Sequence, residues 1–447
     1  MSREDVRAAY NPAGAPGAST RGATGRQAWL VAVLTSIYTL NFVDRGALNL
    51  ILQPIKQDLH VTDLQMSYLL GFSFVVLYSV CSIPAGHVAD IVSRRLMVFS
   101  AVLFWSVMQC LCGFAGTYAQ LFGARVGLGL GEAALPPAAY SLIRDGVRPQ
   151  SRGRAFSIYQ MSPLLGMGFG ALIGGLLYGA ARRGAFHAVP VLGALKPWQV
   201  VLAVPGLAGL LVALVALSIR EPPREAQVRR QDVPGYGEAL RFMGRRWRLF
   251  IPIFVMTTVL ALSTGWNSWM PAALTRIWGL EPSTIGQVTG PLGLVLNPIA
   301  YVIVGHLMDR FTTPTRPDGM LRVAIIGSVL NVPAAMAVLL APSVTLMWIA
   351  YGLSLLLTGA GQVAVAAILA EVLPGRLMGK ATSLQFLVGN ILGLAMGPTL
   401  FALVAKLFSG PRAIADSMLL CYPTIVAVTV GFMILAAREL RRMKLAA

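Results

Sequence analysis

The chain has 447 residues, of which 56% are hydrophobic and 12% are charged, and its mean hydropathy is +0.69. A soluble domain carries about 25% charged residues, so this composition excludes an ordinary soluble protein and indicates a polytopic membrane protein. The net charge of +18 does not indicate a nucleic-acid partner, because the basic residues are scattered over short loops, where they set topology and contact anionic lipid headgroups.

Residues 1–27 are rich in Gly, Ala, Pro and Arg and contain no short apolar run typical of a signal peptide, so we expect a disordered tail. Apolar runs long enough to cross a bilayer follow, each of about 20 residues or more. The alternating pattern of a membrane barrel is absent, so we predict an all-α integral membrane protein. The twelve predicted transmembrane helices are 28–52, 64–85, 97–115, 118–143, 153–180, 198–219, 249–275, 283–307, 321–340, 343–371, 381–407 and 413–437.

The longest interruption, residues 220–248, divides these spans six and six. We therefore predict an N-terminal six-helix bundle over 28–219 and a C-terminal one over 249–437, followed by a tail over 438–447. The linker between the bundles is rich in arginine and should carry a short amphipathic helix, from Glu238 to Arg248, on the membrane surface.

Most Lys and Arg residues outside the spans lie on one side of the membrane: in both tails, in the linker and in alternate loops. This bias places both termini in the cytosol. Because the loops are compact and no targeting segment is seen, we expect a multi-pass protein of a bacterial inner membrane that works as a monomer.

The two halves repeat each other. Gly86 to Asp90 closes the second span as Gly305 to Asp309 closes the eighth, with the pattern Gly-His-x-x-Asp in both. A glycine row in the fifth span has a counterpart in the eleventh. Such repeats predict two pseudo-symmetric bundles related by an axis along the membrane normal, with a binding cavity between them. The glycines should let helices approach closely; they are Gly166, Gly170 and Gly174, and Gly389, Gly393 and Gly397.

These features resemble the major facilitator superfamily over nearly the whole chain, which implies that fold and secondary transport. The loop after the second span reads Gly86-x-x-x-Asp90-x-x-x-Arg94-Arg95, and the fourth span reads Leu121-x-x-x-Arg125-x-x-x-Gly129-x-Gly131. The fifth span resembles the exporter motif, except that Ala171 replaces its proline, so this motif does not assign an antiporter.

A second resemblance is narrower. Asn41-Phe42-Val43-Asp44-Arg45 in the first span, together with Gly129-Leu130-Gly131-Glu132-Ala133 in the fourth, is similar to the Spinster subfamily, whose members move lysophospholipids and sphingosine phosphate. The resemblance implies a proton-linked lipid transporter in which Asp44, Arg45 and Glu132 are functional.

The residues support part of this independently, because charges inside apolar helices are costly and need partners. Arg125 and Glu132 are seven residues apart, so they share one helix face about 10 Å apart. Asp44 and Arg125 should lie at the same depth and are able to pair, whereas Arg45 should reach Glu132 or a substrate anion. We assign Asp44 and Glu132 to proton coupling and Arg45 and Arg125 to the substrate headgroup. The alternative is a static network that only fixes helix packing.

The spans of the second half carry neutral polar residues instead of charges. We predict that Asn267, Trp266, Gln385 and Asn390 line the cavity, although a lone Asn or Gln in a membrane helix often serves only to bond neighbouring helices. One charged wall and one largely apolar wall would suit an amphiphile whose anionic head meets an arginine.

The charged cluster at the cytosolic surface has two interpretations. It is a latch that holds the halves together when the cavity faces outward, or a set of solvated helix caps. The residues of this predicted cytosolic gate are Gly86, Asp90, Arg94, Arg95 and Asp309.

The sequence therefore predicts a proton-coupled secondary transporter that works by alternating access and moves a lysolipid or similar amphiphilic anion. A carrier of a small organic anion is the alternative, and a channel or receptor on the same scaffold is a further one. We expect no metal, no cofactor beyond a proton gradient, and no enzymatic activity, because no metal-ligand spacing, nucleophile elbow or phosphate loop is present.

Overall fold

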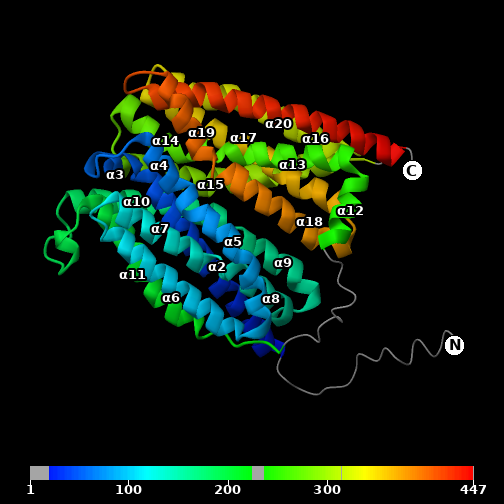
Figure 1. Ribbon diagram of the computed structural model, residues 1–447, viewed down its shortest axis with the longest axis horizontal. Helices are drawn as coiled ribbons and strands as arrows, with labels where there is room; N and C mark the ends of the chain where they lie inside the picture. Colours follow the sequence, from blue (N-terminus) through cyan, green and yellow to red (C-terminus); the bar gives the residue numbers. More distant parts are fainter. Residues whose placement is uncertain (1–19, 224–235, 314, 446–447) are drawn as a thin grey trace.

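The computed structural model describes residues 20–223, 236–313 and 315–445, so most of the predicted N-terminal tail lies outside the described residues. The described chain is built from helices (Figure 1). The N-terminal half comprises α2 (Thr20–Leu50), α3 (Leu52–Asp58), α4 (Asp63–Leu70), α5 (Phe72–Ile91), α6 (Arg94–Gly113), α7 (Tyr118–Glu132), α8 (Leu135–Gly146), α9 (Pro149–Gln160), α10 (Ser162–Arg182), η1 (Leu192–Ala194) and α11 (Pro197–Ala216). The C-terminal half comprises α12 (Tyr236–Arg245), α13 (Trp247–Leu262), α14 (Thr264–Trp278), α15 (Pro282–Phe311), α16 (Gly319–Leu340), α17 (Val344–Val372), α18 (Gly375–Val388), η3 (Gly389–Leu394), α19 (Gly397–Val404), η4 (Ala405–Leu407) and α20 (Ala413–Leu445).

The predicted all-α membrane fold is confirmed. Each of the predicted spans coincides with one helix or with a helix interrupted within its length. Within the described residues, 10 helical segments are long and apolar enough to cross a membrane. The predicted spans outside this set are α2 with α3 and α7 with α8. In α2 the charged residues Asp44 and Arg45 lower the mean hydropathy, whereas α7 and α8, with 15 and 12 residues, are each too short because the span is broken between them.

Several boundaries differ from those expected, and three of them concern the tails and the linker. α2 begins at Thr20, inside the predicted tail, and α20 continues to Leu445, where Glu439 and Arg442 form an i,i+3 ion pair at 2.8 Å that favours helix. The surface helix α12 ends at Arg245, and Arg248 belongs to the first turn of α13 instead.

The fourth span is broken in its middle for a local reason. α7 ends at Glu132 and α8 begins at Leu135, with Pro136 and Pro137 in its first turn. Because proline has no N–H, the carbonyls of Glu132 and Ala133 lose their usual helical donors, and the helix is interrupted. Glu132 therefore sits at the end of a helix rather than inside one.

The two halves touch at one end and diverge toward the other (Figure 1). We call the end where α2 begins, α20 ends and α12 lies the inner end, and the opposite end the outer end. α10 of the N-terminal half packs along α15 of the C-terminal half through a glycine seam: a Cβ added at Gly175 would lie 3.0 Å from the Cα of Gly286, and one at Gly290 would lie 2.9 Å from the carbonyl of Gly168.

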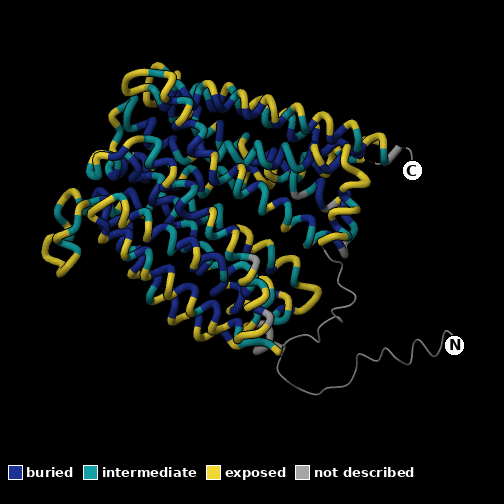
Figure 2. The backbone as a smooth tube through the Cα atoms, in the orientation of Figure 1, coloured by how far each residue is buried: buried dark blue, intermediate teal, exposed yellow. Residues whose placement is uncertain are grey.

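The predicted glycine rows also permit close approach within each half. A Cβ added at Gly170 would lie 3.0 Å from the Cα of Gly46 on α2, and one at Gly393 would lie 3.3 Å from the Cα of Ala261 on α13. Residues on the outward faces of the halves are exposed (Figure 2), and many of them are large apolar side chains such as Val302 and Ile349. An apolar surface of this extent fits contact with lipid rather than with water.

Candidate functional site

The four predicted charged residues lie together inside the N-terminal half. Asp44 and Arg45 are on α2, and Arg125 and Glu132 are on α7. The exposed fractions of Asp44, Arg125 and Glu132 are 1%, 2% and 0%, and the Arg45 side chain is 19% exposed. Burying four ionisable side chains is costly unless they are paired and hydrogen-bonded, so their contacts decide what the cluster can do.

Arg45 forms the ion pair of this cluster. Its Nη2 lies 2.8 Å from Oε2 of Glu132, as the sequence predicted for one of its two possible partners. The guanidinium carbon also lies 4.1 Å from the ring centre of Phe74 and 4.5 Å from that of Phe42. Arg45 is therefore held by a carboxylate and by the faces of two aromatic rings, which attract a cation.

Asp44 and Arg125 do not form the pair that their equal depth suggested. No ion pair within 4.0 Å joins them in the described part of the chain. The Arg125 guanidinium lies 5.7 Å from the ring centre of Phe74 instead. Sequence spacing predicts the depth of a residue along a straight helix but not the direction in which its side chain points. Equal depth is therefore not enough to pair Asp44 with Arg125.

Several polar atoms in the cluster have no protein partner. The acceptors among them are Asp44 Oδ1 and Glu132 Oε1, and the donors are Arg45 Nε, Arg125 Nε and Arg125 Nη1. Buried polar groups are nearly always satisfied, so exceptions in one place require an explanation. A site that binds an anion and exchanges protons would use such donors and acceptors.

The predicted cavity residues of the second half differ in exposure and in local structure. Asn267 is exposed, Gln385 is buried, and Asn390 lies within the π-helical turn η3, a type of distortion that is frequent at functional sites. Trp266 is buried in the core, with its ring centre 4.6 Å from that of Tyr422. In this conformation Trp266 is a packing residue, because it is buried in a hydrophobic core cluster and its ring contacts that of Tyr422.

Sequence reasoning missed a buried polar network in the second half. Asn331 Nδ2 donates to the hydroxyl of Tyr422 at 2.7 Å, and the Ser354 hydroxyl donates to Asn331 Oδ1 at 3.0 Å. These residues come from α16, α17 and α20, and the network satisfies its members. It therefore fixes helix packing, and its only sequence signal is an Asn inside an apolar span.

The halves are joined by ion pairs at the outer end. Arg276 on α14 contacts Asp63, the first residue of α4, at 2.6 and 3.0 Å, and Gln53 at 2.9 Å. Arg182 contacts Glu281 at 2.6 Å. These are the ion pairs between halves within the described residues, and both lie where the halves touch. The outer end is closed in this conformation. The sequence signal for this gate is weak and consists of opposite charges in outer loops.

Replacing Arg276 by glutamine is expected to destabilise the outer closure by about 1.5–3 kcal/mol, because a bidentate, charge-assisted contact is lost. Spin labels placed across the outer end would then report a larger fraction of long distances. The matched control is Lys406→Gln, which removes an exposed outer cation and should leave the distances unchanged. Equal distance distributions in the Arg276 variant and the wild type would contradict this gate.

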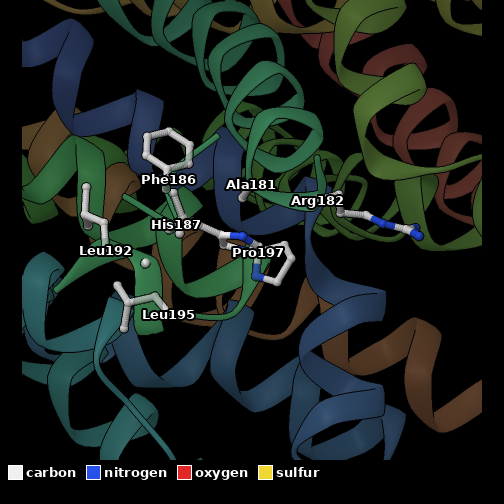
Figure 3. A pocket seen from close by; sticks show the side chains of 9 residues that line it. Ala181, Arg182, Phe186, His187, Leu192, Leu195 and Pro197 are labelled. Atoms are coloured by element: carbon white, nitrogen blue, oxygen red, sulfur yellow. The ribbon is translucent and has the colours of Figure 1, made fainter. Parts of the chain in front are cut away.

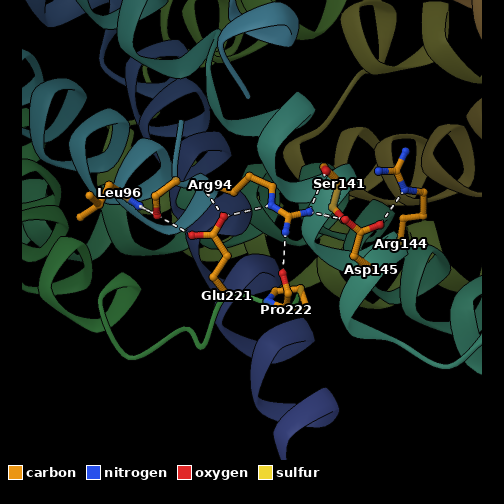
Figure 4. A network of polar contacts seen from close by, with 8 residues as sticks. Arg94, Leu96, Ser141, Arg144, Asp145, Glu221 and Pro222 are labelled. Carbon is orange, nitrogen blue, oxygen red and sulfur yellow. Dashed lines mark hydrogen bonds and ion pairs between the residues drawn. The ribbon is translucent and has the colours of Figure 1, made fainter. Parts of the chain in front are cut away.

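At the inner end, Arg94 is bound within its own half (Figure 4). It pairs with Asp145, donates to the Ser141 hydroxyl at 3.0 Å and to the Pro222 carbonyl at 2.7 Å, and its backbone N–H donates to Glu221 at 2.9 Å. Arg94 thus ties the start of α6 to α8 and to the chain that leaves α11.

Of the other predicted gate residues, those whose side chains the structure describes form no ion pair across the halves. A Cβ added at Gly86 would meet open space, and Arg95 and Asp309 are exposed. The side chain of Asp90 lies outside the described residues. The latch was predicted for an outward-open state, whereas this structure is closed at the outer end, so the latch stays a prediction.

A cavity of about 260 Å³ lies in the outer loop between α10 and α11 (Figure 3). Phe186, His187 and Leu192 line it beside Arg182. It is separate from the charged cluster on α2 and α7, and Arg182 is already bound to Glu281. We therefore do not assign the substrate to this cavity.

Comparison with protein families places this geometry in context. The Major Facilitator Superfamily model matches residues 34–398. Among relatives, an MFS-type efflux pump of Mycolicibacterium smegmatis is 28% identical over 88% of this chain and 89% of its own length. Human protein spinster homolog 1 is 31% identical over 56% of this chain and 46% of its own length. A probable L-galactonate transporter of Escherichia coli is 26% identical over 34% of each chain.

Solved structures show the same fold. A bacterial homologue of the human lysosomal transporter Spinster, in an inward-facing and unoccupied conformation, superposes with a TM-score of 0.79 at 24% identity, covering 96% of this chain and 98% of the other. The nucleoside transporter NupG superposes with a TM-score of 0.67 at 12% identity, covering 91% and 98%.

Proposed function

This chain belongs to the Major Facilitator Superfamily and is similar to its Spinster members, so it is a secondary transporter rather than an enzyme. We propose that it couples protons to the movement of an amphiphilic anion such as a lysophospholipid or sphingosine phosphate. The observation that carries this proposal is the charged cluster of α2 and α7, in which only one of two arginines is paired with a carboxylate.

The proposed coupling is a competition for arginine. In the present state Glu132 holds Arg45. An anionic headgroup that enters the cluster competes for the guanidinium and also meets the unpartnered nitrogens of Arg125. A carboxylate that loses its arginine inside a low-dielectric site is left as an uncompensated buried charge, so it takes up a proton. Glu132 is the carboxylate that loses its arginine in this step, and Asp44, which has no arginine partner in the present state, is proposed as the second coupling carboxylate.

The different character of the two halves supports the proposal that the substrate is an amphiphile. The charged residues of the cluster lie in the N-terminal half, whereas the buried polar residues of the C-terminal spans are neutral, and Asn331, Ser354 and Tyr422 among them are bonded to one another. An anionic head can bind the first wall while an apolar chain contacts the second. We also propose that the inner end faces the cytosol of a bacterium, because basic residues gather there.

The decisive experiment is uptake by purified protein in proteoliposomes under an imposed pH gradient. We expect labelled lysophospholipid or sphingosine phosphate to move with the gradient, and Asp44→Asn and Glu132→Gln to lose the pH dependence. The similarity to a sugar-acid carrier makes soluble organic acids the comparison set. Transport of soluble acids without lysolipids would favour the small-anion carrier, and wild-type pH dependence in both variants would exclude these carboxylates as the coupling groups.

A further inference from the structure

Helix α12 lies across the inner end of the C-terminal half (Figure 1). One edge of α12 is fixed to the bundle, because Ala239 and Met243 are buried, and Met243 packs in the same core cluster as Leu249. The neighbouring edge is apolar but uncovered: Leu240 is 55% exposed, and Trp247, just after the helix, is also 55% exposed. Exposed Leu and Trp side chains on a helix beside a spanning segment fit contact with the lipid interface.

Basic residues border this apolar edge. Arg241, Arg245, Arg246 and Arg248 are all exposed. Two of them lie over aromatic rings, with the guanidinium carbon of Arg246 4.4 Å from the ring centre of Phe242 and that of Arg248 5.5 Å from the ring of Trp247. Cations stacked on aromatic rings beside exposed apolar groups are typical of a helix at a membrane interface.

The helix is also joined to a transmembrane segment. Lys380 on α18 places its Nζ 4.6 Å from the ring centre of Tyr236, and the Tyr236 hydroxyl lies 3.4 Å from Oγ of Ser383. α18 leads directly into η3, which contacts α5 of the N-terminal half. A ligand that immobilises α12 therefore acts on a helix that reaches the boundary between the halves.

We propose that Arg241, Arg245, Arg246 and Arg248, with Leu240 and Trp247, form a binding surface for anionic phospholipids of the leaflet at the inner end. The arginines supply bidentate donors for phosphate oxygens, and the apolar residues enter the acyl region beside the headgroups. The juxtaposition of both kinds of side chain favours a phospholipid over a soluble phosphate, which has no apolar part. This surface is independent of the transported substrate.

The test uses the full-length protein in a neutral detergent and measures the melting temperature with added phosphatidylglycerol, phosphatidylcholine or glycerol phosphate. A ligand that binds only the folded protein raises this temperature. We expect phosphatidylglycerol to raise it, and Arg245→Gln/Arg246→Gln to lose at least about half of that rise. The matched control is Arg438→Gln/Arg441→Gln, which removes two exposed cations at the same end of the molecule and should keep the full rise.

Two results would overturn the proposal: an equal rise in the α12 variant and in the control, or an equal rise with glycerol phosphate. A second measurement does not depend on stability. In nanodiscs, brominated phosphatidylglycerol should quench tryptophan fluorescence more strongly in the wild type than in Trp247→Phe, and this difference should shrink in Arg245→Gln/Arg246→Gln. An unchanged difference in that variant would show that the arginines do not recruit the lipid.

Discussion

Glu132→Ala is expected to abolish transport and to destabilise the protein by about 3–5 kcal/mol, because removing one partner of a buried ion pair leaves the other as an uncompensated charge. The abandoned partner is Arg45, which keeps its contacts with the rings of Phe74 and Phe42 but loses its carboxylate. Thermal unfolding of the purified variant measures the first effect, and uptake by proteoliposomes measures the second.

A double variant separates transport from packing. Replacing a buried ion pair by apolar residues of similar volume is often neutral or stabilising. Arg45→Met/Glu132→Met should therefore recover most of the lost stability and still fail to transport. Transport by this double variant at the wild-type rate would mean that the pair only fixes α2 against α7, which is the static alternative that the sequence left open.

Arg94→Ala is expected to cost about 3 kcal/mol, although Arg94 lies outside the charged cluster, because it removes a buried cation and several hydrogen bonds at once. The variant would leave Asp145, whose side chain is 0% exposed, with the exposed Arg144 as its remaining ion partner, and the Pro222 carbonyl and the Ser141 hydroxyl without this donor. The adjacent substitution Arg95→Ala is the matched control. Arg95 is exposed, so its loss should change stability by no more than about 0.5 kcal/mol. Similar melting temperatures for both variants would contradict this account.

The Arg94 network also makes the stability of the fold depend on pH in the acid range. Burial raises the pKa of Glu221, but hydrogen bonds donated by Ser93 and Arg94 outweigh it and hold this pKa below its usual value. A carboxyl group of this kind stabilises the fold above its unfolded pKa, and the contribution is lost as the pH falls through the lowered folded value. Arg94→Ala should therefore lose less stability than the wild type when the pH is lowered through this range.

The fold followed from the sequence because its signals are local. Apolar runs predict spans, and opposite charges inside α2 and α7 are so costly in lipid that they point to partners on another helix. The Arg45–Glu132 contact was among the expected pairs for this reason. The missing Asp44–Arg125 pair shows the limit: sequence spacing gives depth along a helix, but the rotation of α7 relative to α2 depends on packing around Phe74.

The outer gate depended on information that no local pattern contains. Arg276 and Asp63 are 213 residues apart and belong to different halves, so their contact exists only in a conformation that brings the outer ends together. The end of α20 was predicted too early because a local pattern was misleading. Charged residues after Arg438 suggested a tail, whereas their helix propensity and the Glu439–Arg442 pair extend the helix.

The glycine seam between α10 and α15 has a mechanical consequence. Where helices meet through large side chains, knobs must leave their holes before one helix can roll over another, and this interlocking resists movement. At Gly175 and Gly286 the two backbones meet directly, whereas the side chains of Leu294 and Leu172 pack against Gly168 and Gly290, so the seam combines direct backbone contact with two interlocking leucines. Arg182 at the end of α10 and Glu281 just before α15 form an ion pair at the outer end of this seam, so a tilt that separates the outer ends must break that pair and also shift both leucines along the facing helix.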